Sequence, residues 1–394
     1  MNLFNSLTTV QKSLVVAIVA IVIYLLSAGA VFSFVSSRMP VGQSANNGAG
    51  ANVAESTNPG EVQDEDASIP RTEACPLNGS LKTKNAKEAW EKRRPLAVMI
   101  ENHTEARPQS GLSFADVVYE AVAEGGITRF MAVYYCIYPE IQVGPVRSAR
   151  TYFLDWLAEY DALYAHVGGA NTPGPANALG QIIDYGVKDL NQFSIGFPTF
   201  WRDYQRLGRS VATEHTMYST TNKLWAEGEK RGWSVVDEKG VRWDKNFVSW
   251  KFKDDAAQKG TVTKINVPFW TNQTDYTVEW NYDANCNCYL RVNGGQPHND
   301  LNSNKQVSPK VVIVRYQTES PANDGYEGNA HRLYGNKGTG DALIFQDGQV
   351  IEGKWTKANR LAREKFVDSK GVEITLNKGQ IWLQTVPVGS KVTY

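Results

Sequence analysis

A chain of 394 residues with 42% hydrophobic residues is long enough for one or two packed domains and too apolar to be disordered throughout. Its 41 basic and 41 acidic residues cancel to a formal net charge of +0, so the composition gives no support for binding nucleic acid or an anionic lipid surface. No dinucleotide or P-loop fingerprint is present, and we expect neither a cofactor nor a nucleic-acid partner.

Residues 14–34 are almost continuously apolar, about the 20 residues that a helix needs to cross a bilayer. Apolar sequence continues past the small residues 27–30, which favours an uncleaved anchor over a cleaved signal peptide. Lys12 and Arg38 give almost no positive-inside bias, so the orientation follows from the short N-terminal tail and the large downstream region. We expect residues 1–37 to be a tail and a single-pass membrane anchor, with the folded body outside the cytoplasm.

Residues 38–74 are small and polar, and they predict a disordered tether between the membrane and the folded body. The four cysteines that follow are even in number and suit an oxidising compartment. Cys75 and Cys136 are a candidate disulfide pair. A bridge between Cys286 and Cys288 would be strained, and a zinc site there has only His298 nearby as a further ligand, so we expect no metal.

Strand and helix patterns alternate between residues 75 and 247, which predicts an α/β N-terminal half in which helices cover a layered sheet. The apolar or β-branched runs 96–100, 127–137 and 163–167 predict strands. The segments 114–124, 147–163, 175–185 and 221–232 predict helices.

Short strands separated by glycine, asparagine and aspartate turns dominate residues 248–394 and predict a mainly β C-terminal half. The expected strands are 262–267, 277–282, 289–292, 311–316, 342–345, 350–355 and 381–386. Asp347-Gly348 is a strong turn signal between two of them. Trp355 of this half suits either sugar stacking or the core, and a tryptophan in a strand-rich domain is more often core.

The segment Gly144–Arg150 is the candidate centre of a site. If a helix starts at Arg147, then Arg147 and Arg150 lie one above the other in its first turn. Cations there oppose the helix macrodipole unless carboxylates or a bound anion offset them. Glu101, Glu120 and Glu124 can supply those carboxylates, so the pattern fits either a structural ion-pair network or a ligand pocket.

Polar residues also follow two expected strands, at the strand ends where open α/β sheets bind ligands. The candidate catalytic residues are Glu101, Glu124 and His166, and the candidate ligand-binding residues are Asn102, His103, Arg147, Arg150, Gly168, Gly169 and His215. The glutamates can also serve as the paired carboxylates of a glycoside hydrolase. The histidines with Glu101 can form a metal set, but their spacing matches no local metal motif.

Four stretches of the first half, Arg94–His103, Ala106–Gly111, Gly125–Phe130 and Gly144–Arg150, resemble the YerB-like bacterial lipoprotein family. The likeness resumes at residues 345–355 and 379–382. The resemblance implies a bacterial envelope protein with N- and C-terminal domains of unknown function, and it carries over no catalytic residue. This chain departs from the family in having no cysteine before Cys75, which favours a protein anchor over a lipid.

Together these features predict a membrane-anchored, extracytoplasmic bacterial protein that binds a polar envelope ligand, a glycan or peptide with an anionic group. Arg147 and Arg150 would hold the anion, Glu101 and Glu124 would order the arginines, and the histidines would line the pocket. The alternatives are a hydrolase acting on cell-wall or other envelope material, and a scaffold that docks another envelope protein through its β half.

Overall fold

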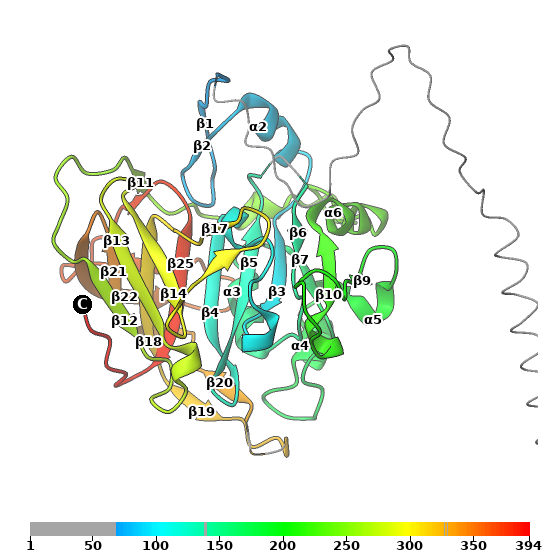
Figure 1. Cartoon of the computed structure of the whole chain (residues 1–394). Helices are drawn as coiled ribbons and strands as arrows, with labels where there is room; N and C mark the ends of the chain where they lie inside the picture. Colours follow the sequence, from blue (N-terminus) through cyan, green and yellow to red (C-terminus); the bar gives the residue numbers. More distant parts are fainter. Residues whose placement is uncertain (1–67, 138–139, 327, 329) are drawn as a thin grey trace, which may run out of the picture. The chain divides into compact units, whose positions relative to one another are not determined.

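The computed structural model describes residues 68–137, 140–326, 328 and 330–394 (Figure 1). The expected tail and anchor, and nearly all of the expected tether, lie outside these residues. Within the part of the chain that the structure describes, no helix is both long and apolar enough to span a bilayer.

One ten-stranded mixed sheet contains strands from both halves of the chain. Its strand order is β23 (Lys365–Val367), β22 (Gln349–Lys357), β21 (Gly338–Gln346), β18 (Val311–Gln317), β25 (Ile381–Pro387), β4 (Val117–Glu124), β5 (Ile127–Tyr134), β3 (Leu96–Glu101), β7 (Leu163–His166) and β8 (Lys188–Asn191). The halves join where β25 pairs in parallel with β4, with Ile381 opposite Val117. Figure 1 shows this junction as the red strand beside the cyan one.

Seven of these strands run in the same direction. β18, β25 and β4 are mutually parallel, as are β3, β7 and β8, and both β4 and β3 pair antiparallel with β5. β22 has the same direction, because β21 pairs antiparallel with both β18 and β22. The carboxyl ends of the seven strands therefore meet at one edge of the sheet, which we call the sheet rim. Open sheets of this kind bind ligands beyond such an edge.

The two faces of the sheet carry separate hydrophobic cores, because successive strand residues point to opposite sides. On one face Met99 packs in the core that contains α3 (Thr151–Leu157) and α4 (Ala178–Asp184). On the other face Val98 packs in the core that contains α6 (Thr221–Lys230) and a smaller sheet. That smaller sheet consists of β12 (Lys264–Val267), β13 (Val278–Asp283), β14 (Cys288–Asn293) and β15 (Gln296–Pro297).

Short elements complete the described fold. They are β1 (Glu73–Ala74), β2 (Leu81–Lys82), α2 (Lys84–Trp90), β6 (Gln142–Val143), α5 (Gln192–Ile195), β9 (Trp201–Arg202), β10 (Met217–Thr220), β11 (Phe252–Lys253), β16 (Asn299–Asp300), β17 (Lys305–Gln306), β19 (Glu319–Pro321), β20 (Arg332–Tyr334) and β24 (Leu376–Asn377). The predicted mixed α/β chain with a largely β C-terminal half is confirmed. Asp347 and Gly348 both have positive φ and form the predicted turn between β21 and β22.

The helix predicted over residues 114–124 is wrong, because Val117–Glu124 is strand β4. Its β-branched run is buried on both faces of the sheet, which is typical of an interior strand. A register shift between Val122 and Glu124 has a further consequence. It places Glu120 and Glu124 on opposite faces of the sheet, whereas the predicted helix would have placed them on one face.

The helix predicted from Arg147 is shorter than expected, because α3 begins at Thr151 and Arg150 is its N-cap. Before it the chain is extended: Val146 bridges to Ile100, and Ala149 bridges to Gly169. These contacts hold the backbone of residues 146–149 in an extended conformation against the sheet, so the helix begins only after them. Arg147 therefore lies outside the helix, over the end of β3.

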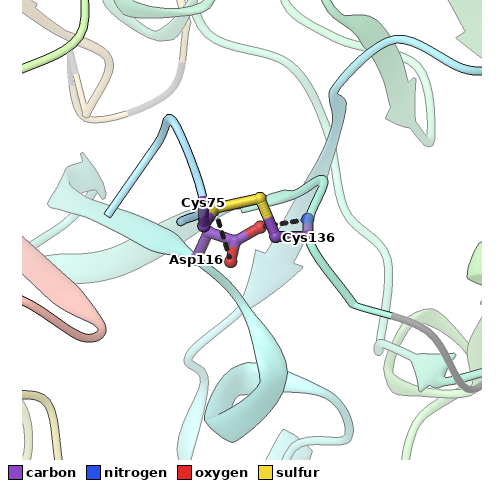
Figure 2. Close-up of side chains that lie close together, drawn as sticks. All are labelled: Cys75, Asp116 and Cys136. Carbon is purple, nitrogen blue, oxygen red and sulfur yellow. Dashed lines mark hydrogen bonds between the residues drawn. A yellow bond between two sulfur atoms is a disulfide. The ribbon is translucent and has the colours of Figure 1, made fainter. Parts of the chain in front are cut away.

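A disulfide joins Cys75 to Cys136 and ties the start of the described chain to the segment after β5. Figure 2 shows Asp116 beside it. The Asp116 carboxylate accepts hydrogen bonds of 2.7 and 2.9 Å from the backbone N–H groups of Tyr135 and Cys136. Cys286 and Cys288 form a second disulfide. Both bridges were weighed from the sequence alone, and the structure contains both.

Candidate functional site

Glu101 is the last residue of β3 and lies at the sheet rim, nearly buried at 5% side-chain exposure. One of its oxygens, Oε2, accepts a hydrogen bond of 2.8 Å from Nδ1 of His215, which ends the short 3₁₀ turn before β10. Its other oxygen, Oε1, lies 3.0 Å from Nε of Arg147. One buried carboxylate thus holds an imidazole and a guanidinium from two distant segments.

Two further side chains complete this group. His103 stacks on His215 with ring centroids 4.7 Å apart and an interplanar angle of 10°. The carboxylate of Glu105 lies 3.5 Å from Nε2 of His215 and is half exposed. We call Glu101, His103, Glu105, Arg147 and His215 the rim cluster. Four of the candidate residues from the sequence, Glu101, His103, Arg147 and His215, lie together in this cluster.

The rim cluster combines the guanidinium of Arg147 and two imidazoles with the carboxylates of Glu101 and Glu105. The hydrogen bond to Glu101 raises the pKa of His215 above its ordinary value, outweighing burial and the nearby charge of Arg147, which both lower it. The side chain of Arg147 is 23% exposed, and among the described residues only Glu101 forms an ion pair with it. A partly exposed guanidinium beside an imidazole that protonates readily is suited to a carboxylate or phosphate.

His103, Glu105 and His215 are also close enough to share a metal ion. However, the two imidazole planes are almost parallel. Lone pairs lie in the ring planes, so both rings cannot point at one ion unless one of them rotates. In addition, Nδ1 of His103 accepts a hydrogen bond of 3.2 Å from the backbone N–H of Glu105. In this geometry the two imidazoles do not converge on a common ion.

Arg150 and Glu124 belong to a second cluster. Glu124 pairs with Arg150 and, at 2.9 Å, with Nη2 of Arg129, and both arginines are almost fully buried. Burial alone would raise the pKa of Glu124, but Arg129, Arg150 and Arg147 lower it to about 2. Arg129 also donates to the carbonyl of Ser148 at 2.8 Å. The arrangement therefore orders the segment that carries Arg147.

His166 is fully buried at the end of β7 and is not part of the rim cluster. Its Nε2 bonds Asp189 at 2.7 Å, and its Nδ1 bonds the carbonyl of Gly168 at 2.7 Å. Gly168 has a φ of 57°, and a Cβ on Gly169 would lie 3.0 Å from the side chain of Leu179. These three residues shape the turn after β7, and in this structure neither ring nitrogen of His166 is open to a ligand.

Asn102 and Glu120 lie beneath the rim, on the face that carries the smaller sheet. Asn102 is fully buried and accepts a hydrogen bond of 2.8 Å from Asn293 of the C-terminal half. Glu120 is paired with Arg291 at 2.8 Å and accepts from Nε1 of Trp382 at 2.9 Å. Because Glu120 is buried on the face opposite Glu124, the two glutamates do not form the paired carboxylates of a glycoside hydrolase.

The sequence interpretation missed two partners, Glu105 and Asp189. Glu105 lies two residues after His103, a spacing that offers a local signal. Asp189 reaches His166 only because β7 and β8 are adjacent.

Comparisons with known proteins place the chain in a family. Residues 81–234 match the N-terminal domain, and residues 265–383 the C-terminal domain, of the family described as "Protein of unknown function (DUF3048)". The chain is 32% identical over 317 residues to a protein of Bacillus subtilis (strain 168) named "Putative lipoprotein YerB", covering 79% of this chain and 86% of that protein. It is also similar to the crystal structure of YerB protein from Bacillus subtilis, with a TM-score of 0.67 and 28% identity over 82% of this chain and 100% of that one. The predicted resemblance is confirmed, and the chain belongs to this YerB-like family of unknown function.

Proposed function

We propose that the chain is an extracytoplasmic, membrane-attached bacterial protein whose rim cluster binds an anionic group of a cell-envelope glycan or peptide. The observation that carries the proposal is the environment of Arg147. Its Nε lies against the buried carboxylate of Glu101, and its side chain stays 23% exposed beside the stacked rings of His103 and His215. A ligand carboxylate or phosphate bound there would meet two cationic groups already held in position.

Three features support the location. The relative named above carries the name "Putative lipoprotein YerB". The described part of this chain contains two disulfides, which persist in oxidising compartments. Residues 14–34 have the length and apolar character of a membrane anchor. Deletion of residues 14–34 should therefore release the protein from the membrane fraction, and continued sedimentation with membranes would contradict this anchor.

A second function, hydrolysis of an envelope polymer, is favoured by the pair of Glu101 and His215. A buried carboxylate that accepts from Nδ1 fixes the imidazole in one tautomer and orientation, as in enzymes that use a histidine as general base. Nε2 of His215 then faces the rim, where it would activate a water molecule. Arg147 would hold the anionic group of the substrate.

Incubation of the full chain, kept in detergent, with purified bacterial cell wall separates these functions. Both the sedimented protein and the soluble products would be measured for the native chain and for Glu101→Gln. Sedimentation without products supports a binding protein. Products that disappear in Glu101→Gln, while sedimentation remains, support a hydrolase. If the native chain neither sediments nor releases products, the ligand is not in the wall and the proposal fails.

A further inference from the structure

Two short strands from opposite ends of the C-terminal half lie side by side. β11 and β24 pair in parallel, with Lys253 directly opposite Asn377. Side chains of register partners point to the same face of a sheet. A lysine and an asparagine that are 124 residues apart in the sequence are therefore neighbours in the fold.

The two side chains are in contact. Nζ of Lys253 donates a hydrogen bond to Oδ1 of Asn377. Because a C=O bond is only about 1.2 Å long, an amine this close to the oxygen is also close to the electrophilic carbon, Cγ. Reactions between groups held in one site begin from such a near contact.

Asp347, in the turn between β21 and β22, contacts both groups with one carboxylate. Its Oδ2 accepts a hydrogen bond of 2.6 Å from Nζ of Lys253, and its Oδ1 accepts one of 2.7 Å from Nδ2 of Asn377. The backbone N–H of Ala256 and Nδ2 of Asn287 also donate to Oδ1, at 3.0 and 2.8 Å. The carboxylate is thereby fixed between the amine and the NH₂ group of the amide.

The amide and the carboxylate are shielded from water. Asn377 is fully buried, and Asp347 is 3% exposed. The backbone N–H of Asn377 donates to Oε1 of Gln346 at 2.9 Å, so this residue is held at its backbone as well as at its side chain. The side chain of Lys253 is 36% exposed, which leaves a way out for a small product.

A second trio of the same residue types shows what distinguishes this one. Lys264 and Asn281 are register partners in β12 and β13, and Glu279 contacts them at 2.5 and 3.1 Å. However, the side chain of Lys264 is 61% exposed, and within the described chain no hydrogen bond joins it to Asn281. That trio is a surface ion pair, whereas the buried trio places an amine against an amide carbonyl.

From this geometry we infer that Lys253 and Asn377 become joined by an intramolecular amide bond, with Asp347 as the catalytic acid and base. Asp347 takes a proton from the Lys253 ammonium, and the free amine attacks Cγ of Asn377. Asp347 then protonates Nδ2, the bond from Cγ to Nδ2 breaks, and ammonia leaves. The remaining extra proton of Nζ passes through Asp347 to the ammonia. The products are one secondary amide and one ammonium ion, with no oxidant or reductant involved.

The state of Asp347 before the reaction suits its first step. Burial alone would raise the pKa of Asp347, but hydrogen bonds from Lys253, Asn287 and Asn377 lower it. The carboxylate is therefore ionised and can accept the proton. It is also a weak base, so we expect one slow reaction after folding.

The bond would close most of the C-terminal half into a covalent loop, which limits the unfolded chain in the way that a disulfide does. Unlike a disulfide, it would survive reduction. The inference does not depend on the function proposed for the rim cluster, because none of its residues belongs to that cluster.

Mass spectrometry of the reduced, denatured full chain tests the bond. We expect an intact mass that is lower than the sequence mass by one ammonia molecule. Trypsin does not cleave after a lysine whose Nζ is acylated, so the digest should contain a branched peptide in which residues 252–259 are joined to residues 371–378. Lys253→Arg keeps the positive charge beside Asp347 but removes the nucleophile, and it should have the full mass.

Asp347→Asn keeps the shape of the side chain but cannot accept the proton. In freshly purified protein it should form the branched peptide at least about 100-fold more slowly than the native chain, because general acid–base catalysis contributes at least that much. Lys264→Arg, in the exposed trio, is the matched control and should keep the native mass and the native branched peptide. Thermal unfolding of each variant shows whether it is folded.

A native chain with the full sequence mass and no branched peptide overturns the proposal. So does a loss of ammonia that persists in Lys253→Arg, because cyclisation of an asparagine on its own backbone gives the same mass without a branched peptide. If Asp347→Asn is folded and forms the bond as fast as the native chain does, the catalytic role of Asp347 is overturned.

Discussion

The carboxylate of Glu101 accepts a hydrogen bond of 2.8 Å from Nδ1 of His215, and each side chain is only 5% exposed. A carboxylate can only accept, so Nδ1 carries the proton and Nε2 is directed away from Glu101. The contact spans 114 residues of sequence and fixes both the tautomer and the orientation of the ring. Glu101 thereby sets the charge of the rim cluster as well as its geometry.

Replacing Glu101 with glutamine should lower the pKa of His215 towards its ordinary value of 6.5, because the charged hydrogen-bond acceptor that raises it is lost. An NMR titration of the histidine ring protons measures the change. Glu105→Gln is the matched control, and its effect should be smaller because Glu105 is half exposed and 3.5 Å from the ring. A His215 pKa that is the same in Glu101→Gln and the native chain would contradict the assignment.

Glu124→Gln should destabilise the fold by about 3–5 kcal/mol, because it leaves the buried cations of Arg129 and Arg150 without their carboxylate. Urea unfolding monitored by tryptophan fluorescence gives the free energy of unfolding. Glu88→Gln, at an exposed helical position, should change it by less than about 0.5 kcal/mol. Equal effects at the two positions would show that the Glu124 cluster does not order the fold.

The lowered pKa of Glu124 predicts that the stability of the fold depends on pH. Its pKa is about 2 in the folded chain, below the ordinary value of 4.5, so it binds protons more weakly than in the unfolded chain. Its contribution to stability is therefore complete above about pH 4.5 and is lost as the pH falls towards 2. Unfolding measured across this range should show a shallower loss of stability in Glu124→Gln. Parallel curves for the native chain and the variant would exclude this role.

Removing the Cys75–Cys136 disulfide by replacing both cysteines with serine should destabilise the fold by about 4 kcal/mol, because the bridge closes a loop of 61 residues. The pair Cys286 and Cys288 is the internal control, since its bridge closes a very short loop and constrains the unfolded chain less. Thermal unfolding of the two double variants compares them. The prediction fails if the Cys286–Cys288 variant loses as much stability as the Cys75–Cys136 variant.

The elements with the clearest sequence patterns were predictable. The apolar run of β3, the capped helix α6 and the short strands of the C-terminal half lie where the sequence placed them, within a few residues. The sequence of β4 predicts a helix because Ser113 resembles an N-cap, Asp116 follows three residues later, and Gly125 and Gly126 resemble a helix stop. Its burial on both faces removed the alternation that marks a strand, so only its neighbours in the sheet reveal it.

The candidate site was predictable as a set of residue types at strand ends, and less so as a set of contacts. Glu101 and His215 come together because β10 and the end of β3 both contact the extended segment at Val146, a tertiary arrangement. Arg147 and Arg150 looked equivalent in sequence. The β-bridges at Val146 and Ala149 keep this segment extended and separate the two arginines. Arg147 therefore faces the rim, while Arg150 is buried with Glu124.

The affinity of Arg147→Ala for a soluble anionic fragment of cell wall tests the central proposal most directly, with Arg231→Ala, at the C-cap of α6, as the matched control. A charged hydrogen bond to the ligand contributes about 1.5–3 kcal/mol, so we expect the dissociation constant to rise by roughly 10- to 150-fold in Arg147→Ala. It should stay at the native value in Arg231→Ala, and the native affinity should fall with added salt. A dissociation constant unchanged by Arg147→Ala, in a variant that unfolds at the native temperature, would contradict the account.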